Sequence, residues 1–337
     1  MAIENSTILG KFLLEGSSDY MQRVPDALQL SYSEHVKNLF DPYNKDLFNV
    51  FTNMLNGIAA TYVDGKTFYN PLRVLKKPAE QDSFGAVERH IAVDFIQART
   101  YRADNEAGLL KYEPPRFSEW YYSCSEPRQY PFTWSRFDIR RAFSRDGYGF
   151  NDLLDRTIGS AISSDEYDEM LIMLHMITEA DNSLDGGIYK HTLSAAPTNQ
   201  ATAQELLAAV RTYAGKFTFP NVIYNHLDNI PTFTNRENLV FFTTPEVASV
   251  IDVYALAAAF NRSDAEIQYR VIIVPEFEIP NMYGLLCDED FLFARDAYYG
   301  IDSFHNPAQI ADKYYLNHAA YYGVNPAACA CAFVTAS

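Results

Sequence analysis

The longest helical pattern in the chain runs from residue 150 to about residue 180. Apolar residues recur there three or four positions apart, which places them on one face of a helix. They are Leu153, Leu154, Ile158, Ile162, Tyr167, Met170, Leu171, Leu174 and Ile177. At 1.5 Å per residue, such a helix spans ~45 Å, whereas helices of compact domains average about three turns. The fold must therefore accommodate one unusually long helix, and we expect its methionines to fill a core rather than bind a cofactor.

The C-terminal part of the chain predicts an end that is held in a sheet. Residues 271–275 (VIIVP) have the pattern of a buried strand, and residues 282–293 are apolar apart from an acidic turn at Asp288-Glu289-Asp290. An aromatic stretch over 314–322 is followed by small and apolar residues over 327–336. Chain ends usually fray unless a sheet ties them down, so we expect this end to be packed.

Residues 88–134 predict a large hairpin. A strand is expected over 88–99, a polar loop over 102–119, and the returning strand over 130–134. Such a hairpin has little core of its own, so we expect it to lean on another subunit. A basic patch of Arg73, Lys76 and Lys77 precedes it, and this patch would pair with acidic groups across a subunit contact.

The rest of the chain predicts alternating helices and strands. Helices are expected over 25–41, 45–61, 136–143, 202–214 and 245–260, strands over 239–243 and 269–274, and a loop-rich segment over 217–234. Thr202 is the expected cap of its helix. Residues 1–23 have the composition of an arm that is either disordered or packed on something else.

Charge and aromatic content restrict the kind of partner. The net charge is −16, with 43 acidic and 27 basic residues, which argues against a surface that binds duplex DNA through lysine and arginine. The 24 tyrosines and 23 phenylalanines suit either a tyrosine-rich core or extensive subunit contacts, and composition leaves both open.

The cysteines and the N-terminus point to a reducing compartment without a membrane anchor. Cys124, Cys287, Cys329 and Cys331 are scattered, and the C-x-C pair lies among alanines and a phenylalanine, as buried thiols do. The first twenty or so residues lack a basic region and a long apolar run, so no signal peptide is expected. No stretch reaches ~18 uninterrupted apolar residues, so no membrane span is expected.

Motifs for catalysis or cofactor binding are missing from the sequence. It contains no G-x-G-x-x-G, P-loop, G-x-S-x-G or H-E-x-x-H. Asp288, Glu289 and Asp290 would suit a divalent cation, but an acidic triplet between apolar runs is more typical of a turn. Glu276 and Glu278 would suit a glycosidase acid/base pair, but the flanking prolines favour a loop. We therefore predict no catalytic, cofactor-binding or metal-binding residue.

The histidines show no ligand spacing. They are scattered over the chain at His35, His90, His175, His191, His226, His305 and His318. His175 stands between Leu174 and Met176 in the long helical pattern, which indicates a hydrogen-bonded histidine within the core.

The order of four segments resembles the major capsid proteins of small short-tailed phages, which have the Hong Kong 97-like fold. The segments are NPLRVLKKP with the strand after it; YPFTWSRFDIRRAF with GFNDLLDRTIGSAISSDEYDEMLIMLHMI; LVFFTTPEVASVIDVYALAAAFN; and CDEDFLFARDAYYGIDSFHNPAQIADKYYLNHAAYYGVNPAACACAF. The resemblance covers most of residues 65–180 and 239–333. The chain ends just past the last expected strand, so no appended immunoglobulin-like domain is expected.

The resemblance implies an α+β fold in five parts. These are an N-terminal arm with helices (1–64), an extended loop hairpin (65–138), a spine helix with the first part of the peripheral domain (139–189), an axial domain (190–300) and a return to the peripheral domain (301–337). It also makes the tyrosines of the C-terminal stretch candidates for a contact surface.

The implied function is that of a non-enzymatic capsid subunit. Copies would form hexamers and pentamers of an icosahedral shell that encloses double-stranded DNA without sequence-specific binding. Portal and scaffolding proteins would be partners, no membrane or cofactor would take part, and the protein would reside in the virion after assembly in the host cytoplasm. Two alternatives are an encapsulin-type nanocompartment shell and a carbohydrate-active enzyme that uses Glu276, Glu278 or Asp290.

Overall fold

The computed structural model describes residues 68–78, 87–98, 114–123, 127–144, 149–183, 187–227, 230–251, 270–306 and 311–336, with four isolated positions near residue 34. Of the helix expected over 25–41, Ser33, Glu34 and Lys37 are described and helical. The arm at 1–23 and the helix expected over 45–61 lie outside the described residues. No helix among the described residues is both long and apolar enough to cross a membrane.

The chain divides into two compact units. The first unit contains Met1–Asn70, Pro127–Asp168 and Tyr298–Ala319, and the second contains Pro71–Glu126, Glu169–Ala297 and Ala320–Ser337. Both units are thus built from segments that are far apart in the sequence.

A three-stranded sheet and the first half of the long helix form the first unit. The strand order is β3 (Arg128–Ser135), β9 (Ala311–Val324) and β8 (Leu292–Asn306), and β3 pairs antiparallel with β9. Trp134 is buried between sheet and helix: its ring lies 4.6 Å from that of Tyr314, and its indole N–H donates to Thr157 Oγ1 at 2.9 Å. Aromatic packing therefore joins the strands to the helix.

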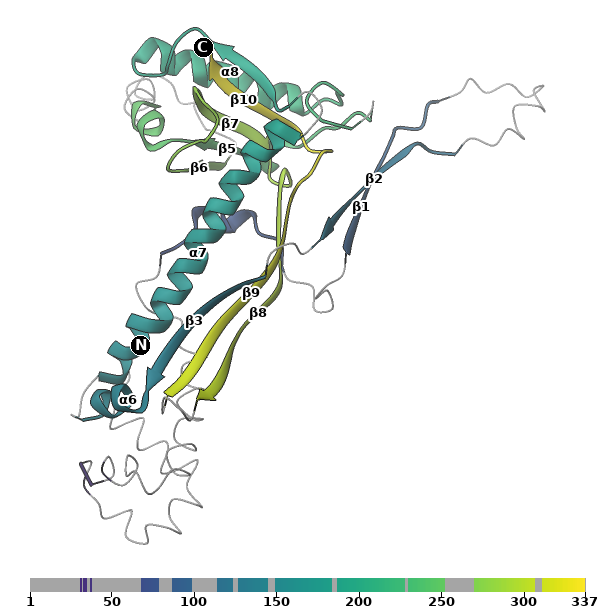
Figure 1. Cartoon of the computed structure of the whole chain (residues 1–337). Helices are drawn as coiled ribbons and strands as arrows, with labels where there is room; N and C mark the ends of the chain where they lie inside the picture. The colour runs from purple at the N-terminus through teal and green to yellow at the C-terminus, as the bar shows by residue number, and fades with distance from the viewer. Residues whose placement is uncertain are drawn as a thin grey trace. The chain divides into compact units, whose positions relative to one another are not determined.

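A five-stranded sheet, covered by a helix on each face, forms the body of the second unit (Figure 1). The strand order is β4 (Tyr189–Leu193), β10 (Ala330–Thr335), β7 (Met282–Asp288), β5 (Leu239–Thr243) and β6 (Arg270–Ile273). Side chains alternate between the two faces of a strand. Phe242 and Leu285 accordingly pack with the second half of the long helix, while Phe241 and Phe333 pack with α8.

The helices confirm the expected elements and correct one cap. Helix α6 spans Arg136–Ala142, α7 spans Gly149–Ser183, α8 spans Gln200–Phe217, and short 3₁₀ helices span Pro71–Leu75 (η2) and Arg236–Asn238 (η3). The helix expected at 245 begins there and is described to residue 251. Asn199, rather than Thr202, caps α8: the two side chains exchange hydrogen bonds with each other's backbone N–H groups in a capping box.

The hairpin exists, but its returning strand was predicted at the wrong place. Strand β1 (Val87–Val93) pairs antiparallel with β2 (Phe117–Ser123), not with residues 130–134. Strand β2 has the sequence FSEWYYS. Its first three residues fall within the stretch predicted as a polar loop, residues 102–119. Strand β3, which contains residues 130–134, pairs with β9 instead, and it holds Pro131 because it is an edge strand.

Two further expectations about burial were wrong in part. In the segment expected as a buried strand, Ile272 and Val274 are buried, whereas Val271 and Ile273 are 44% and 49% exposed, because alternate side chains of a strand lie on opposite faces. Among the tyrosines of the C-terminal stretch, Tyr314 and Tyr321 are buried in the core and cannot serve as a contact surface. The expectation that the C-terminus is tied down is confirmed, since β10 has a strand on either side.

The central position of β10 leads to a stability prediction. Replacing Phe333 with alanine should lower the free energy of unfolding by about 3–5 kcal/mol, because a fully buried ring is lost and a cavity remains. Chemical denaturation of the purified protein measures the effect. Val271→Ala, on the exposed edge of the same sheet, is the control and should change the stability by less than about 1 kcal/mol.

Candidate interaction surface of the hairpin

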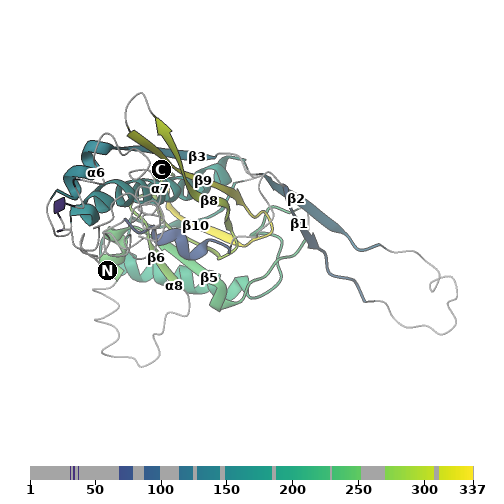
Figure 2. The same ribbon diagram turned by 90° about the horizontal axis from the view of Figure 1, so that it is seen from below.

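One face of the β1–β2 hairpin is apolar and exposed. The register pairs Arg89 with Tyr121 and Val93 with Phe117, so odd-numbered residues of both strands share this face. Its apolar members are between 50% and 59% exposed: Val87, Ile91, Val93, Phe117 and Tyr121. Arg89 and Glu119 form an ion pair among them. The two strands run side by side in both views (Figures 1 and 2). This surface, named the outer face below, is of the kind that marks a protein contact.

The opposite face anchors the hairpin to its own unit. Tyr122 stacks on Phe293 with 4.4 Å between ring centroids, and its hydroxyl donates to the backbone oxygen of Val324 at 3.1 Å. His90 meets Phe293 edge-on at 5.1 Å. A Cβ atom on Gly323 would lie 2.3 Å from the Tyr122 ring, so only glycine leaves room for it. Burial raises the pKa of Tyr122, so the side chain is uncharged where it packs against Phe293.

Ion pairs complete the attachment. Arg295 Nη1 lies 3.0 Å from Glu88 Oε2, and Glu88 Oε1 lies 2.8 Å from His90 Nε2. The backbone N–H of Lys77 donates to the backbone oxygen of Ala294 at 2.8 Å, and the Lys77 ammonium forms an ion pair with Asp290. The start of β8 thus holds both the hairpin and the segment that leads into it.

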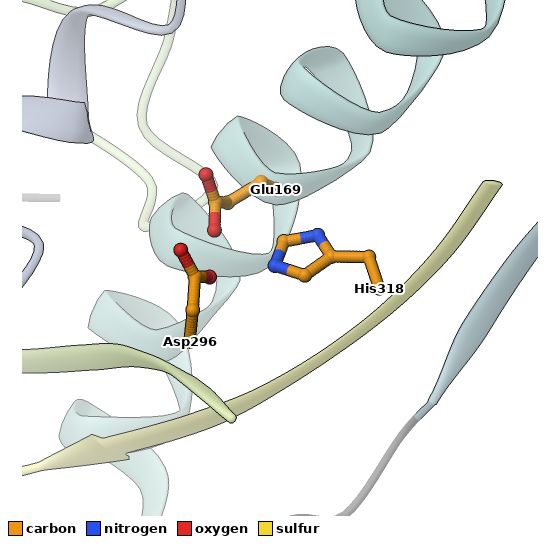
Figure 3. Close-up of side chains that lie close together, drawn as sticks. All are labelled: Glu169, Asp296 and His318. Atoms are coloured by element: carbon orange, nitrogen blue, oxygen red, sulfur yellow. The ribbon is translucent and has the colours of Figure 1, made fainter. Parts of the chain in front are cut away.

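Lys76 lies between two carboxylates of the second unit. Its Nζ is 2.7 Å from Glu169 Oε1 and 2.6 Å from Asp296 Oδ1, and the Glu169 side chain is 1% exposed. The hydroxyl of Tyr322 donates to the same Glu169 oxygen at 3.0 Å. Figure 3 shows the carboxylates of Glu169 and Asp296 close to each other. The ammonium lies within ion-pair distance of both carboxylates and compensates one of their two negative charges. Lys76 and Lys77 therefore pair within the chain and not across a subunit contact as expected.

The long helix also buries carboxylates in the first unit. Asp165 Oδ1 lies 2.8 Å from Nδ1 of His318, and both residues are buried. Arg128 Nη2 approaches the same imidazole nitrogen to 3.0 Å. His318 is the third side chain drawn in Figure 3. Sequence reasoning missed these inward-facing charges, although Asp165 and Glu169 follow Ile158 and Ile162 at helical spacing and so fall on the apolar stripe.

The structure places the remaining candidate carboxylates in loops and turns. Glu276 and Glu278 lie in the loop after β6, as expected. Glu278 accepts a hydrogen bond at 2.9 Å from the His175 imidazole, which raises the pKa of His175 and lowers that of Glu278. The prediction that His175 lies in the core was wrong: its side chain is 57% exposed, because it points away from the face that Leu174 and Met176 bury.

The acidic triplet forms the expected turn between β7 and β8. Asp288 Oδ1 accepts from the backbone N–H of Asp290 at 2.8 Å, and burial raises the pKa of Asp288. The N–H of Glu289 donates to the oxygen of Asn238 at 2.8 Å. Since Asp290 pairs with Lys77, the turn helps to hold the segment before the hairpin, a role that the sequence did not reveal.

The prediction of buried free thiols is confirmed for three of the four cysteines. Cys287, Cys329 and Cys331 are free and buried, and Cys124 lies outside the described residues. Burial raises the pKa of Cys329 to about 11 and that of Cys331 to about 12. The predicted core role of Met170, Met173 and Met176 is confirmed as well.

Comparison with known proteins identifies the family. The model of the Phi29-like phage major capsid protein matches residues 11–334. The chain belongs to this family. It is 24% identical to the major capsid protein of Streptococcus phage Cp-1 over 94% of this chain and 90% of that one, and 26% identical to that of Bacillus phage GA-1 over 81% and 58%. The resemblance drawn from the sequence is thereby confirmed, as is the prediction of a structural capsid protein of a tailed phage.

Solved phage capsids share the fold. A capsid structure of Staphylococcus phage Andhra matches with a TM-score of 0.62 at 14% identity, covering 82% of this chain and 87% of that one. A structure of native bacteriophage P68, described by its head fiber and inner core protein, matches with a TM-score of 0.61 at 13% identity over the same shares. The mixed helix and strand architecture is therefore one found in phage particles.

The Lys76 cluster gives a prediction about stability. Lys76→Met should lower the free energy of unfolding by about 3–5 kcal/mol, because Glu169 is left charged and buried without its cation. Adding Glu169→Gln should restore part of the loss, as read by urea unfolding. Lys190→Met serves as the control, since the Lys190 side chain is 45% exposed where it pairs with Asp181 and should contribute less than about 1 kcal/mol. Equal effects of the two lysine changes would contradict the assignment.

The thiols give a prediction about reactivity. Cys287, Cys329 and Cys331 should resist alkylation by iodoacetamide at pH 8 in the native protein, because they are buried and their raised pKa values keep them protonated. All three should react after denaturation. Peptide mapping by mass spectrometry distinguishes each site from Cys124, and rapid native labelling of Cys331 would contradict the burial.

Proposed function

We propose that copies of this chain assemble into the hexamers and pentamers of an icosahedral shell with the Hong Kong 97-like fold, and that the shell encloses double-stranded DNA. Membership of the Phi29-like capsid family supports the shell. The observation that carries the mode of assembly is the outer face of the hairpin, where five large apolar side chains remain at least half exposed.

The division into domains follows from the same proposal. Residues 1–64 are the N-terminal arm with its helices, 65–138 the extended loop, 139–189 the spine helix with part of the peripheral domain, 190–300 the axial domain, and 301–337 the return to the peripheral domain. Within the extended loop, β1 and β2 form the hairpin, and η2 with the two lysines that follow it forms the lead-in.

The hairpin serves as a contact with a neighbouring subunit. Burying apolar surface contributes roughly 25 cal/mol per Å², so one such contact is modest, and a shell gains from repeating it around closed symmetry. The Arg89–Glu119 pair satisfies its own charges within the face. The anchored inner face supports this role, because an interface element that is held in place loses less conformational entropy on binding.

The acidic charge suits a wall around DNA. The 43 acidic residues outnumber the 27 basic ones, which disfavours tight binding to phosphates. In this proposal the shell contains DNA without sequence-specific binding. Portal and scaffolding proteins are further partners in this proposal, assembly takes place in the host cytoplasm, and the mature protein resides in the virion. The role is non-enzymatic and requires no cofactor.

An interface variant tests the proposal. Ile91→Glu should reduce the assembled fraction at least roughly tenfold, because a charge in a desolvated apolar contact costs well over 1.4 kcal/mol. Velocity sedimentation and electron microscopy measure assembly, and circular dichroism checks folding. Gln204→Glu adds the same charge at an exposed position on α8 and should assemble normally. The assembly mode would be refuted by shells of Ile91→Glu that form as readily as those of the unaltered protein, and the shell itself by unaltered protein that never forms rings or shells.

A further inference from the structure

A second exposed apolar surface lies on the loop between α8 and η3. Phe219 is 71% exposed, Ile223 60% and Phe233 53%, with Val222 at 40%. These four side chains, called the loop patch below, come from two arms of a loop whose described residues are 218–227 and 230–235. Side chains of this kind normally fold inward, so their shared exposure requires an explanation.

The loop is built to hold these side chains outward. The backbone N–H groups of Asn221 and Thr232 each donate to the other's oxygen at 3.0 Å, which closes the loop as a short bridge. The buried amide of Asn225 donates to the oxygen of Ile230 at 2.7 Å and to the Thr232 hydroxyl at 2.8 Å. Tyr224, in the same loop, is buried, and its backbone oxygen accepts a hydrogen bond from the backbone N–H of Ala330. The exposed side chains therefore sit on an internally hydrogen-bonded frame.

The loop patch is continuous with the hairpin. The ring of Phe95, two residues beyond β1, stacks on Phe233 with 6.2 Å between centroids and 24° between planes. Phe95 is itself 53% exposed, and its neighbour Ile96 is 86% exposed. The apolar surface thus extends from the loop onto the hairpin arm that carries the outer face.

The loop patch carries little charge. Residues 218–227 and 230–235 include no Asp, Glu, Lys or Arg, and Asp228 is the one such residue in the sequence of the loop, in a chain whose net charge is −16. Two copies of so acidic a chain repel each other, and they approach at least cost where the local surface carries the least charge. A nucleic acid would require lysine or arginine at the contact. The low charge and the continuity with the hairpin therefore favour another copy of the chain as the occupant.

We propose that the loop patch, together with Phe95 and Ile96, is a contact between two copies of this chain in the assembled shell. The proposal rests on the shell-forming function and adds a surface to it. The hairpin and the loop patch then form one apolar strip on a subunit, so a neighbour is held at two places that are fixed relative to each other by the Phe95–Phe233 stack.

Substitution of Ile223, whose side chain is 60% exposed within the loop patch, tests this proposal. Ile223→Glu should reduce the assembled fraction at least roughly tenfold by sedimentation, while its thermal unfolding as a free subunit stays within about 2 °C of the unaltered protein, since the side chain is exposed. Ile223→Leu, which keeps the apolar surface, should assemble normally. Gln204→Glu, which adds the same charge on an exposed position of α8, should also assemble normally.

The partner is identified by a photo-crosslinking amino acid in place of Ile223. In assembled particles it should link to a second copy of the chain, and mass spectrometry of the product gives the residues reached. Ile223→Glu particles that assemble at the normal level would overturn the proposal while leaving the shell function intact. A crosslink to a different protein would overturn the choice of occupant. Failure of the unaltered protein to assemble would instead count against the shell function.

Discussion

The start of β8 is the element on which the exposed part of the second unit depends. The ring of Phe293 packs against the rings of Tyr122 and His90, and Arg295 forms an ion pair with Glu88. Next to them, the backbone oxygen of Ala294 accepts a hydrogen bond from the backbone N–H of Lys77, and Asp296 forms an ion pair with the ammonium of Lys76. Four residues in a row thus fix both the hairpin and the segment that enters it. Since β8 follows directly from the five-stranded sheet through the turn at 289–291, the packed core of the unit is connected to its candidate contact surface by a very short path.

The parts of the fold that depend on local pattern were predictable. The long helix, the strand at 239–243 and the acidic turn follow from periodicity and turn chemistry, and each stands at the expected residues. Pairing partners were less predictable. The choice between residues 117–123 and 130–134 as the mate of β1 depends on tertiary register, and both segments alternate in the same way. The β-strand propensity of a segment does not determine which strand pairs with it.

The candidate surface shows the same limit. The sequence indicated a hairpin that leans on a neighbour, but it could not say which face is covered by the chain itself, because Val93 and Ala92 are both apolar and differ only in the face they occupy. The basic patch misled for a related reason. Lys76 and Lys77 meet acids that lie 93 and 213 residues further along the chain, and such distant partners leave no local signal. The inward-facing acids of α7, Asp165 and Glu169, did leave a local signal, which is their helical spacing from Ile158 and Ile162.

The two-stranded construction of the hairpin has a kinetic consequence. Neither strand pairs with a third strand in the part of the chain that the structure describes, so a freshly folded subunit offers backbone edges beside an apolar face. Such edges invite indiscriminate pairing between chains. Aggregation therefore competes with the shell assembly proposed above for as long as subunits are free. In that proposal a neighbouring subunit covers the outer face, which then no longer takes part in aggregation.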